Sequence, residues 1–195
     1  MLRLRVAIAA LVICASTLTA QQLGTIDFPT SAPAAAQAPF IRGVLFLHSF
    51  EYESAAQAFM EAQRIAPDFA MAYWGEAMTY THPVWNEQDV SKARAALSRL
   101  GATAAARRAK AGTDREKMYL DAVEALYGEG SKARRDTMFA AAVERVAAAF
   151  PNDDEAQAFH ALALLGLNQG VRDTCGYVQD KLADVDGEIH EPEPH

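Results

Sequence analysis

Histidine and carboxylate side chains recur in this chain at spacings that suit a transition metal. Glu51 follows His48 by three residues, one helical turn, and His82 follows His48 by 34 residues. Imidazole and carboxylate groups bind copper and zinc in many proteins. Equivalent positions on stacked helices have backbones about 8–10 Å apart, so the side chains must converge across that gap. A metal site of His48, Glu51 and His82 is therefore the weaker hypothesis, and no cofactor is expected.

Aromatic and apolar residues repeat at the same 34-residue interval. Phe40 corresponds to Trp74, and Val44 corresponds to Met78. Aromatic rings dominate recognition surfaces because they provide a large contact area. The candidate partner-binding stripe has Trp85 at its edge and consists of Phe40, Val44, Leu47, His48, Trp74, Met78 and His82. The alternative is that Phe40 and Trp74 belong to the core, and that Trp85 fills a gap between repeats.

A charged pair shares the interval as well. Arg42 and Glu76 are 34 residues apart, and adjacent repeats would bring the two side chains within reach. They are a possible buried ion pair, in which the cost of desolvation offsets much of the attraction. The alternative is two solvated side chains on the wall of a groove.

Several classes of function are excluded by motif and charge. The sequence has no Cys-x-x-Cys-His, His-Glu-x-x-His or Gly-x-Ser-x-Gly motif and no glycine-rich phosphate loop. The protein is therefore not expected to be an enzyme. The net charge is −7 and no basic stripe is present, which argues against nucleic acid as a partner.

The positions of these residues depend on helices. Apolar periodicity predicts helices near residues 39–49, 53–66, 69–81, 89–100, 114–128, 131–149 and 154–168, with no β-sheet. Pro67 and Pro151 follow predicted helix ends. Thr113 and Glu116 fit a capping box at the start of a helix. An all-α fold of antiparallel neighbouring helices is expected.

The interval of 34 residues is that of the tetratricopeptide repeat (TPR), and the signature residues accompany it: Gly43, Phe46, Ala55, Phe59 and Pro67. Over residues 39–168 the chain resembles the TPR family. The stretches 48–52 and 72–85 resemble secreted bacterial TPR proteins of unassigned activity. This resemblance implies a right-handed helical solenoid, of about three to three and a half repeats, with a concave groove for a peptide or protein segment. It implies no catalytic residues.

The two ends of the chain differ in character from the middle. Residues 1–20 are interpreted as a signal peptide, with Arg3 and Arg5 before an apolar run and Ala20 before the cleavage point. Residues 21–38 are a predicted linker, 39–168 the repeat domain, and 169–195 an acidic tail or truncated repeat. No stable membrane span is expected after removal of the signal, so the protein is expected in the periplasm or outside the cell.

Together these features favour an exported helical-repeat scaffold that binds a protein or peptide segment in its groove. The alternative hypothesis is a periplasmic protein that binds a small molecule or a transition metal through His48, Trp74 and His82.

Overall fold

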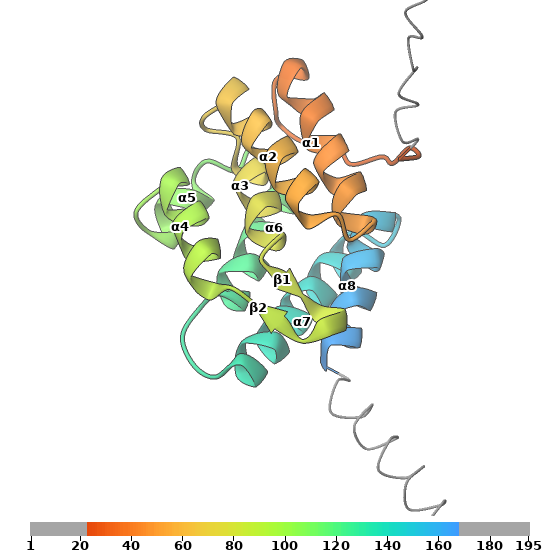
Figure 1. Cartoon of the computed structure of the whole chain (residues 1–195), viewed down its shortest axis with the longest axis vertical. Helices are drawn as coiled ribbons and strands as arrows, with labels where there is room; N and C mark the ends of the chain where they lie inside the picture. Colours follow the sequence, from red (N-terminus) through yellow and green to blue (C-terminus); the bar gives the residue numbers. More distant parts are fainter. Residues whose placement is uncertain (1–22, 168–195) are drawn as a thin grey trace, which may run out of the picture.

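The computed structural model describes residues 23–167, which are mostly helical (Figure 1). The helices are α1 (Ala34–His48), α2 (Tyr52–Ile65), α3 (Ala70–Met78), α4 (Val90–Leu100), α5 (Ala104–Arg108), α6 (Asp114–Leu126), α7 (Lys132–Ala149) and α8 (Asp154–Leu167). Two short strands, β1 (Thr81–His82) and β2 (Glu87–Gln88), flank the 3₁₀ turn η1 (Pro83–Trp85). The prediction of an all-α fold is therefore confirmed for the overall helical content.

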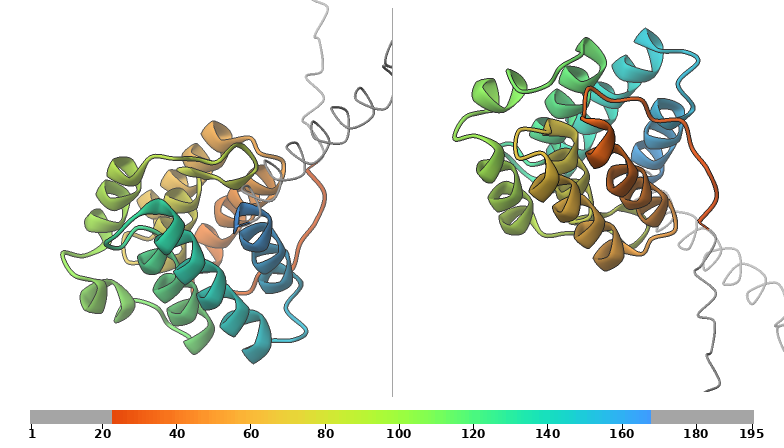
Figure 2. Two further views of the ribbon diagram at one scale, coloured as in Figure 1. Left: turned by 90° about the horizontal axis from the view of Figure 1, so that it is seen from below. Right: turned by 90° about the horizontal axis from the view of Figure 1, so that it is seen from above.

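Neighbours in the sequence pack as neighbours in space. The most extensive contacts join α1 with α2, α6 with α7 and α7 with α8, followed by α2 with α3 and α3 with α4. Helix α3 also packs on α6, which ties the two halves of the fold together (Figures 1 and 2). No helix within residues 23–167 has the length and apolar character needed to cross a membrane.

Local side-chain chemistry sets several helix ends. Thr113 accepts a hydrogen bond from the backbone of Glu116, and the Glu116 side chain accepts one from the Thr113 backbone, so the predicted capping box is confirmed. Asp89 caps α4 and Asp153 caps α8 by the same kind of bond. Pro67 follows the end of α2 as predicted, because proline breaks a helix that approaches it from the N-terminal side.

Aromatic rings form the centre of the core. Trp74 lies 5.2 Å from Tyr119 and 5.1 Å from Phe159, measured between ring centroids. Phe59 lies between α1 and α3, beside Gly43 and Gly75. A Cβ atom at Gly43 would lie 2.7 Å from the Phe59 ring, and one at Gly75 would lie closer still. Both glycines are therefore required by the close approach of the helices.

The described part of the predicted linker is instead integrated into the fold. Phe28 is buried, with its ring centroid 5.2 Å from that of Phe40, and residues 34–38 already belong to α1. The buried Glu116 carboxylate fastens this segment to α6, because it accepts hydrogen bonds from Ser31 N (2.6 Å) and Ser31 Oγ (2.7 Å). It also accepts one from Gly112 N (2.7 Å). Burial of a phenylalanine and a satisfied carboxylate stabilises a segment that has no periodicity of its own.

The expectation of no β-sheet is wrong for residues 81–88. Thr81 pairs with Gln88 and His82 with Glu87 in a short antiparallel ladder. Asn86 takes the left-handed conformation (φ 57°) that closes the turn, a conformation that asparagine tolerates better than most residues. The predicted helix over 69–81 accordingly ends at Met78. The predicted signal peptide (residues 1–20) and the predicted acidic tail (residues 169–195) lie outside the described residues.

Candidate functional site

Most of the predicted partner-binding stripe lies in the core. The side chains that are buried are Phe40, Val44, Leu47, Trp74 and Met78. Trp74 is only 1% exposed, so it contributes neither to a peptide groove nor to a small-molecule site. The prediction is wrong for Phe40, Val44, Trp74 and Met78, because a repeat interval also reproduces the helix face that packs inward. Leu47 is buried as well, but it lines an apolar groove between α1 and α8.

The predicted pair between Arg42 and Glu76 does not form. Arg42 pairs with Glu61 on the exposed surface of α2. Glu76 is buried and instead binds Arg99 of α4, with a further hydrogen bond from Gln63 Nε2 (2.5 Å). The charge of Glu76 is therefore compensated by Arg99 of the next helix, α4.

The two histidines of the metal hypothesis have separate partners. His48 Nε2 lies 2.6 Å from Glu155 Oε2 of α8. His82 Nδ1 lies 3.2 Å from Glu87 Oε2, and its Nε2 lies 3.1 Å from the Thr79 carbonyl oxygen. Over residues 23–167, no three His, Cys, Asp or Glu side chains gather in a way that would hold a metal ion. The fold therefore does not bring His48, Glu51 and His82 together as one metal site.

His82 and Trp85 belong instead to an aromatic cluster, the hairpin surface, together with Phe50 and Tyr52. The His82 ring stacks on Tyr52 with 3.9 Å between centroids, and Trp85 meets Phe50 edge-on at 5.5 Å. Phe50 is 45% exposed and Trp85 is 55% exposed. Phe50 also has a positive φ of 60°, an uncommon and strained conformation for a bulky residue. The α1–α2 turn thus holds a large apolar ring toward solvent.

An apolar groove continues from this surface between α1 and α8. It has a volume of about 390 Å³, and its lining residues are Leu47, His48, Phe50, Ala158, Phe159, Ala161, Leu162 and Leu165. Leu164, Leu165 and Leu167 are exposed near the end of α8. The α1–α8 groove and the hairpin surface share Phe50, so they form one continuous apolar area.

A more polar cavity of about 580 Å³ lies beside the Tyr52–His82 stack, and its walls include Glu53, Glu87, Asp89 and Lys92. Burial, and then the nearby Glu87 carboxylate, raise the pKa of the Tyr52 hydroxyl above its ordinary value of 10.0. Tyr52 therefore stays neutral and can pack its ring against His82 over the physiological pH range.

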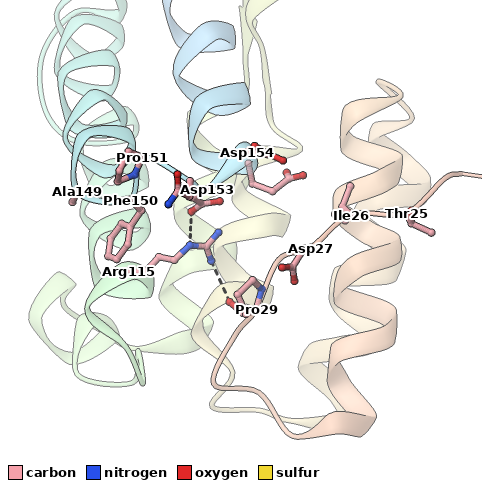
Figure 3. Close-up of a pocket in the computed structure, with 12 residues that line it drawn as sticks. Thr25, Ile26, Asp27, Pro29, Arg115, Ala149, Phe150, Pro151, Asp153 and Asp154 are labelled. Atoms are coloured by element: carbon pink, nitrogen blue, oxygen red, sulfur yellow. Dashed lines mark hydrogen bonds and ion pairs between the residues drawn. The ribbon is translucent and has the colours of Figure 1, made fainter.

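A third cavity, here called the α7–α8 cavity, has a volume of about 620 Å³. It lies between the extended residues 25–29, the start of α6 and the turn from α7 to α8 (Figure 3). Carboxylates line it from two sides, at Asp27 and at residues 153–155, and Ile26, Phe150 and Pro151 supply apolar walls.

Arg115 forms part of the wall of this cavity. Its Nε donates to Asp153 Oδ2 (2.5 Å) and its Nη1 donates to the Pro29 carbonyl oxygen (3.1 Å). The guanidinium carbon lies 4.2 Å from the centre of the Phe28 ring. Burial opposes the charge of Arg115, but the bond to Asp153 and the nearby acidic groups raise its pKa above the ordinary value. The arginine is therefore charged and held rigidly between α8 and the N-terminal segment.

Neither Phe50 nor Arg115 was identified from the sequence as a site residue. Phe50 had a usable signal, because it lies in a predicted turn between helices, where an aromatic side chain has no helix face to join. Arg115 had none, since its partners Pro29 and Asp153 are far from it in the sequence.

Comparisons with models of protein families, with curated proteins and with solved structures find no match to this chain.

Proposed function

We propose that the protein is an exported, TPR-like helical-repeat scaffold that binds an apolar segment of another protein. The hairpin surface and the α1–α8 groove hold this segment. One observation carries the proposal: Phe50 and Trp85 contact one another, are each about half exposed, and adjoin an apolar groove. Apolar areas of this kind mark interaction sites on soluble proteins.

The helical-repeat part of the proposal is supported by the packing of consecutive helices. Most successive helices contact one another, and the glycines at residues 43 and 75 allow α1 and α3 to approach the same ring, Phe59. Small residues at helix crossings and apolar faces that are buried only by neighbours are typical of such repeats.

The proposed occupant is an amphipathic helix. The residues of α8 that line the groove run from Ala158 to Leu165, a distance of about 10 Å along the helix. That length suits two turns of a second helix, whose apolar side chains at i, i+3 and i+4 would enter between α1 and α8. His48, the ionisable side chain among the lining residues of the groove, already binds Glu155 of α8.

Trp85 provides a direct test, because the chain has two tryptophans and the other, Trp74, is buried. In a Trp74→Phe variant, Trp85 is the fluorescence reporter. Helical peptides selected on the immobilised protein from a displayed library should shift the Trp85 emission to shorter wavelength as its indole leaves water. Circular dichroism would verify that this variant remains folded.

Matched variants decide where the peptide binds. Leu165→Ser in the groove should weaken binding at least about tenfold, since a buried leucine side chain contributes about 1.5–3 kcal/mol. Ile65→Ser, an exposed apolar residue at the far end of α2, should leave binding unchanged. Selected peptides that bind both variants equally well would exclude the groove, and failure to select any peptide would argue against the function itself.

A further inference from the structure

We propose that the α1–α8 groove is filled, when no partner is bound, by residues 171–183 of the same chain, which act as an autoinhibitory segment. These residues follow α8 in the sequence and lie outside the described part of the chain. That the groove also receives a partner rests on the proposed function, whereas its occupation by the 171–183 segment does not.

Helix α8 presents an apolar stripe to the groove. Ala158, Leu162 and Leu165 line the groove from positions i, i+4 and i+7 of the helix, so they are aligned over about 10 Å. Phe159, on a neighbouring side of α8, is buried in the core, but Leu165 is 43% exposed. The stripe therefore has room for a helix packed alongside α8.

The 171–183 segment carries an apolar stripe of its own. Val171, Cys175, Val178 and Leu182 follow one another at spacings of four, three and four residues. In an α-helix this spacing places all four side chains on one face, and the charged residues of the segment fall outside that face. The last three of these residues also extend over about 10 Å, the same length as the stripe on α8.

The two stripes are in register for an antiparallel helix pair. In such a pair, facing residues lie at equal distances from the turn, because both helices rise equally per residue. The facing pairs are Ala158 with Leu182, Leu162 with Val178 and Leu165 with Cys175. Their members lie 12, 8 and 5 residues, respectively, before and after Gly170. Residues 168–170 are a connection of the length that joins antiparallel neighbours in helical proteins.

The segment depends on the groove for its helical structure. Gly176 and several β-branched residues lower its helix propensity, and an isolated helix of about 13 residues is marginal in water. Tethered beside the groove, the segment acts at an effective concentration on the order of millimolar. It therefore excludes weak ligands, and a partner that forms a more stable helix displaces it.

Disulfide trapping tests the position of the segment without any partner. In the full chain with Cys14→Ser, Cys175 is the one native thiol. A thiol introduced by Leu165→Cys should oxidise with it at least about tenfold faster than one introduced by Leu164→Cys, because a disulfide requires Cα atoms within about 7 Å. Leu164 is the matched control, since it is equally exposed at 43% but does not line the groove.

A second pair of positions, farther from the turn, tests the register. In a chain with both native cysteines replaced by serine, Ala158→Cys combined with Leu182→Cys should form a disulfide at least about tenfold faster than Ala158→Cys combined with Asp180→Cys. Position 180 lies on the opposite face of the helix from the apolar stripe.

Competition for the groove tests the autoinhibition. Val178→Asp in the full chain should release the segment and raise the affinity of the selected helical peptides at least about tenfold, since the tethered competitor is lost. Gln179→Asp adds the same charge outside the apolar stripe and should leave the affinity unchanged.

The outcomes separate this inference from the proposed function. Equal oxidation of the Leu165→Cys and Leu164→Cys chains, or equal rates for the two pairs that include Ala158→Cys, would show that the segment does not lie in the groove, whatever the peptides do. Unchanged peptide affinity in Val178→Asp would contradict the autoinhibition. If the expected disulfides form but no peptide binds even the Val178→Asp chain, the segment occupies the groove and the proposed function is wrong.

Discussion

Replacing Arg115 with methionine tests the role of the Arg115–Asp153 pair in holding three parts of the fold together. Methionine keeps the unbranched stem of the arginine side chain, out to the level of Nε, but leaves the Asp153 carboxylate without its cation. Removing one partner of a buried ion pair costs about 3–5 kcal/mol. Arg115 and Asp153 retain side-chain exposures of 11% and 10%, and the variant also removes the unpaired Nη2 donor. Both facts place the expected loss at the lower end, about 3 kcal/mol.

The assay is urea unfolding at pH 7, followed by circular dichroism. In thermal unfolding, the same loss of about 3 kcal/mol would appear as a decrease in Tm of about 6–12 °C for a domain of this size. The double variant Arg115→Met with Asp153→Asn should regain part of the loss, because it no longer buries an unpaired charge. Asparagine also retains the ability to cap α8.

The comparison of single and double variants isolates the coupling between the two residues. If Arg115→Met alone lowers the free energy of unfolding by less than about 1 kcal/mol, the pair is effectively solvated. If the double variant is no more stable than Arg115→Met, the loss comes from packing against Phe28 rather than from the charge of Asp153. Either result would refute the argument from the buried pair.

Three further predictions concern stability. Gly75→Ala should destabilise the fold by about 1–3 kcal/mol, because the new methyl group meets Phe59. Phe59→Leu in the same chain should relieve part of the clash. If urea unfolding shows that the losses of the two single variants simply add in the double variant, this explanation is wrong. Burial raises the pKa of Tyr127 well above 10.0, so above pH 10 the unfolded chain ionises where the folded chain does not. Stability should therefore fall as pH rises, less steeply in Tyr127→Phe, as unfolding midpoints from pH 8 to 11 would measure. Hydrogen bonds from the Lys92 backbone and from Ser91 lower the pKa of Asp89 to about 2. Its stabilising effect should be complete above pH of about 3.9 and disappear toward pH 2, so Asp89→Ala should lower the urea midpoint at pH 7 and leave it unchanged at pH 2.

The sequence was sufficient to predict every described helix except α5, because their signals are local. Apolar periodicity, the Thr113–Glu116 capping box and the proline at residue 67 all act within a few residues of the helix end that they determine. The short helix α5 was missed because five residues are too few for a periodic pattern. The hairpin over 81–88 was missed because two-residue strands carry no alternation.

The site was less predictable, because repetition of a residue type does not say which way it faces. Phe40 and Trp74 keep the repeat interval and are both buried. Part of what covers both rings is Phe28, which lies 5.2 Å from one ring and 5.8 Å from the other and comes from a segment without periodicity. Pairs such as Arg99 with Glu76 depend on the final packing of α4 on α3, so residue spacing alone did not identify them.

The bond between Ser31 and Glu116 has a consequence for the order in which the chain folds. The two residues are separated by 85 positions, and ribosomes add roughly 5–20 residues per second. Ser31 and Phe28 are thus made roughly 4–17 seconds before the carboxylate that anchors them. Throughout that interval Phe28 lacks Tyr119, which follows Glu116 in the chain, so the aromatic surroundings of its ring are incomplete. The first described segment of the chain is therefore among the last to reach its final position.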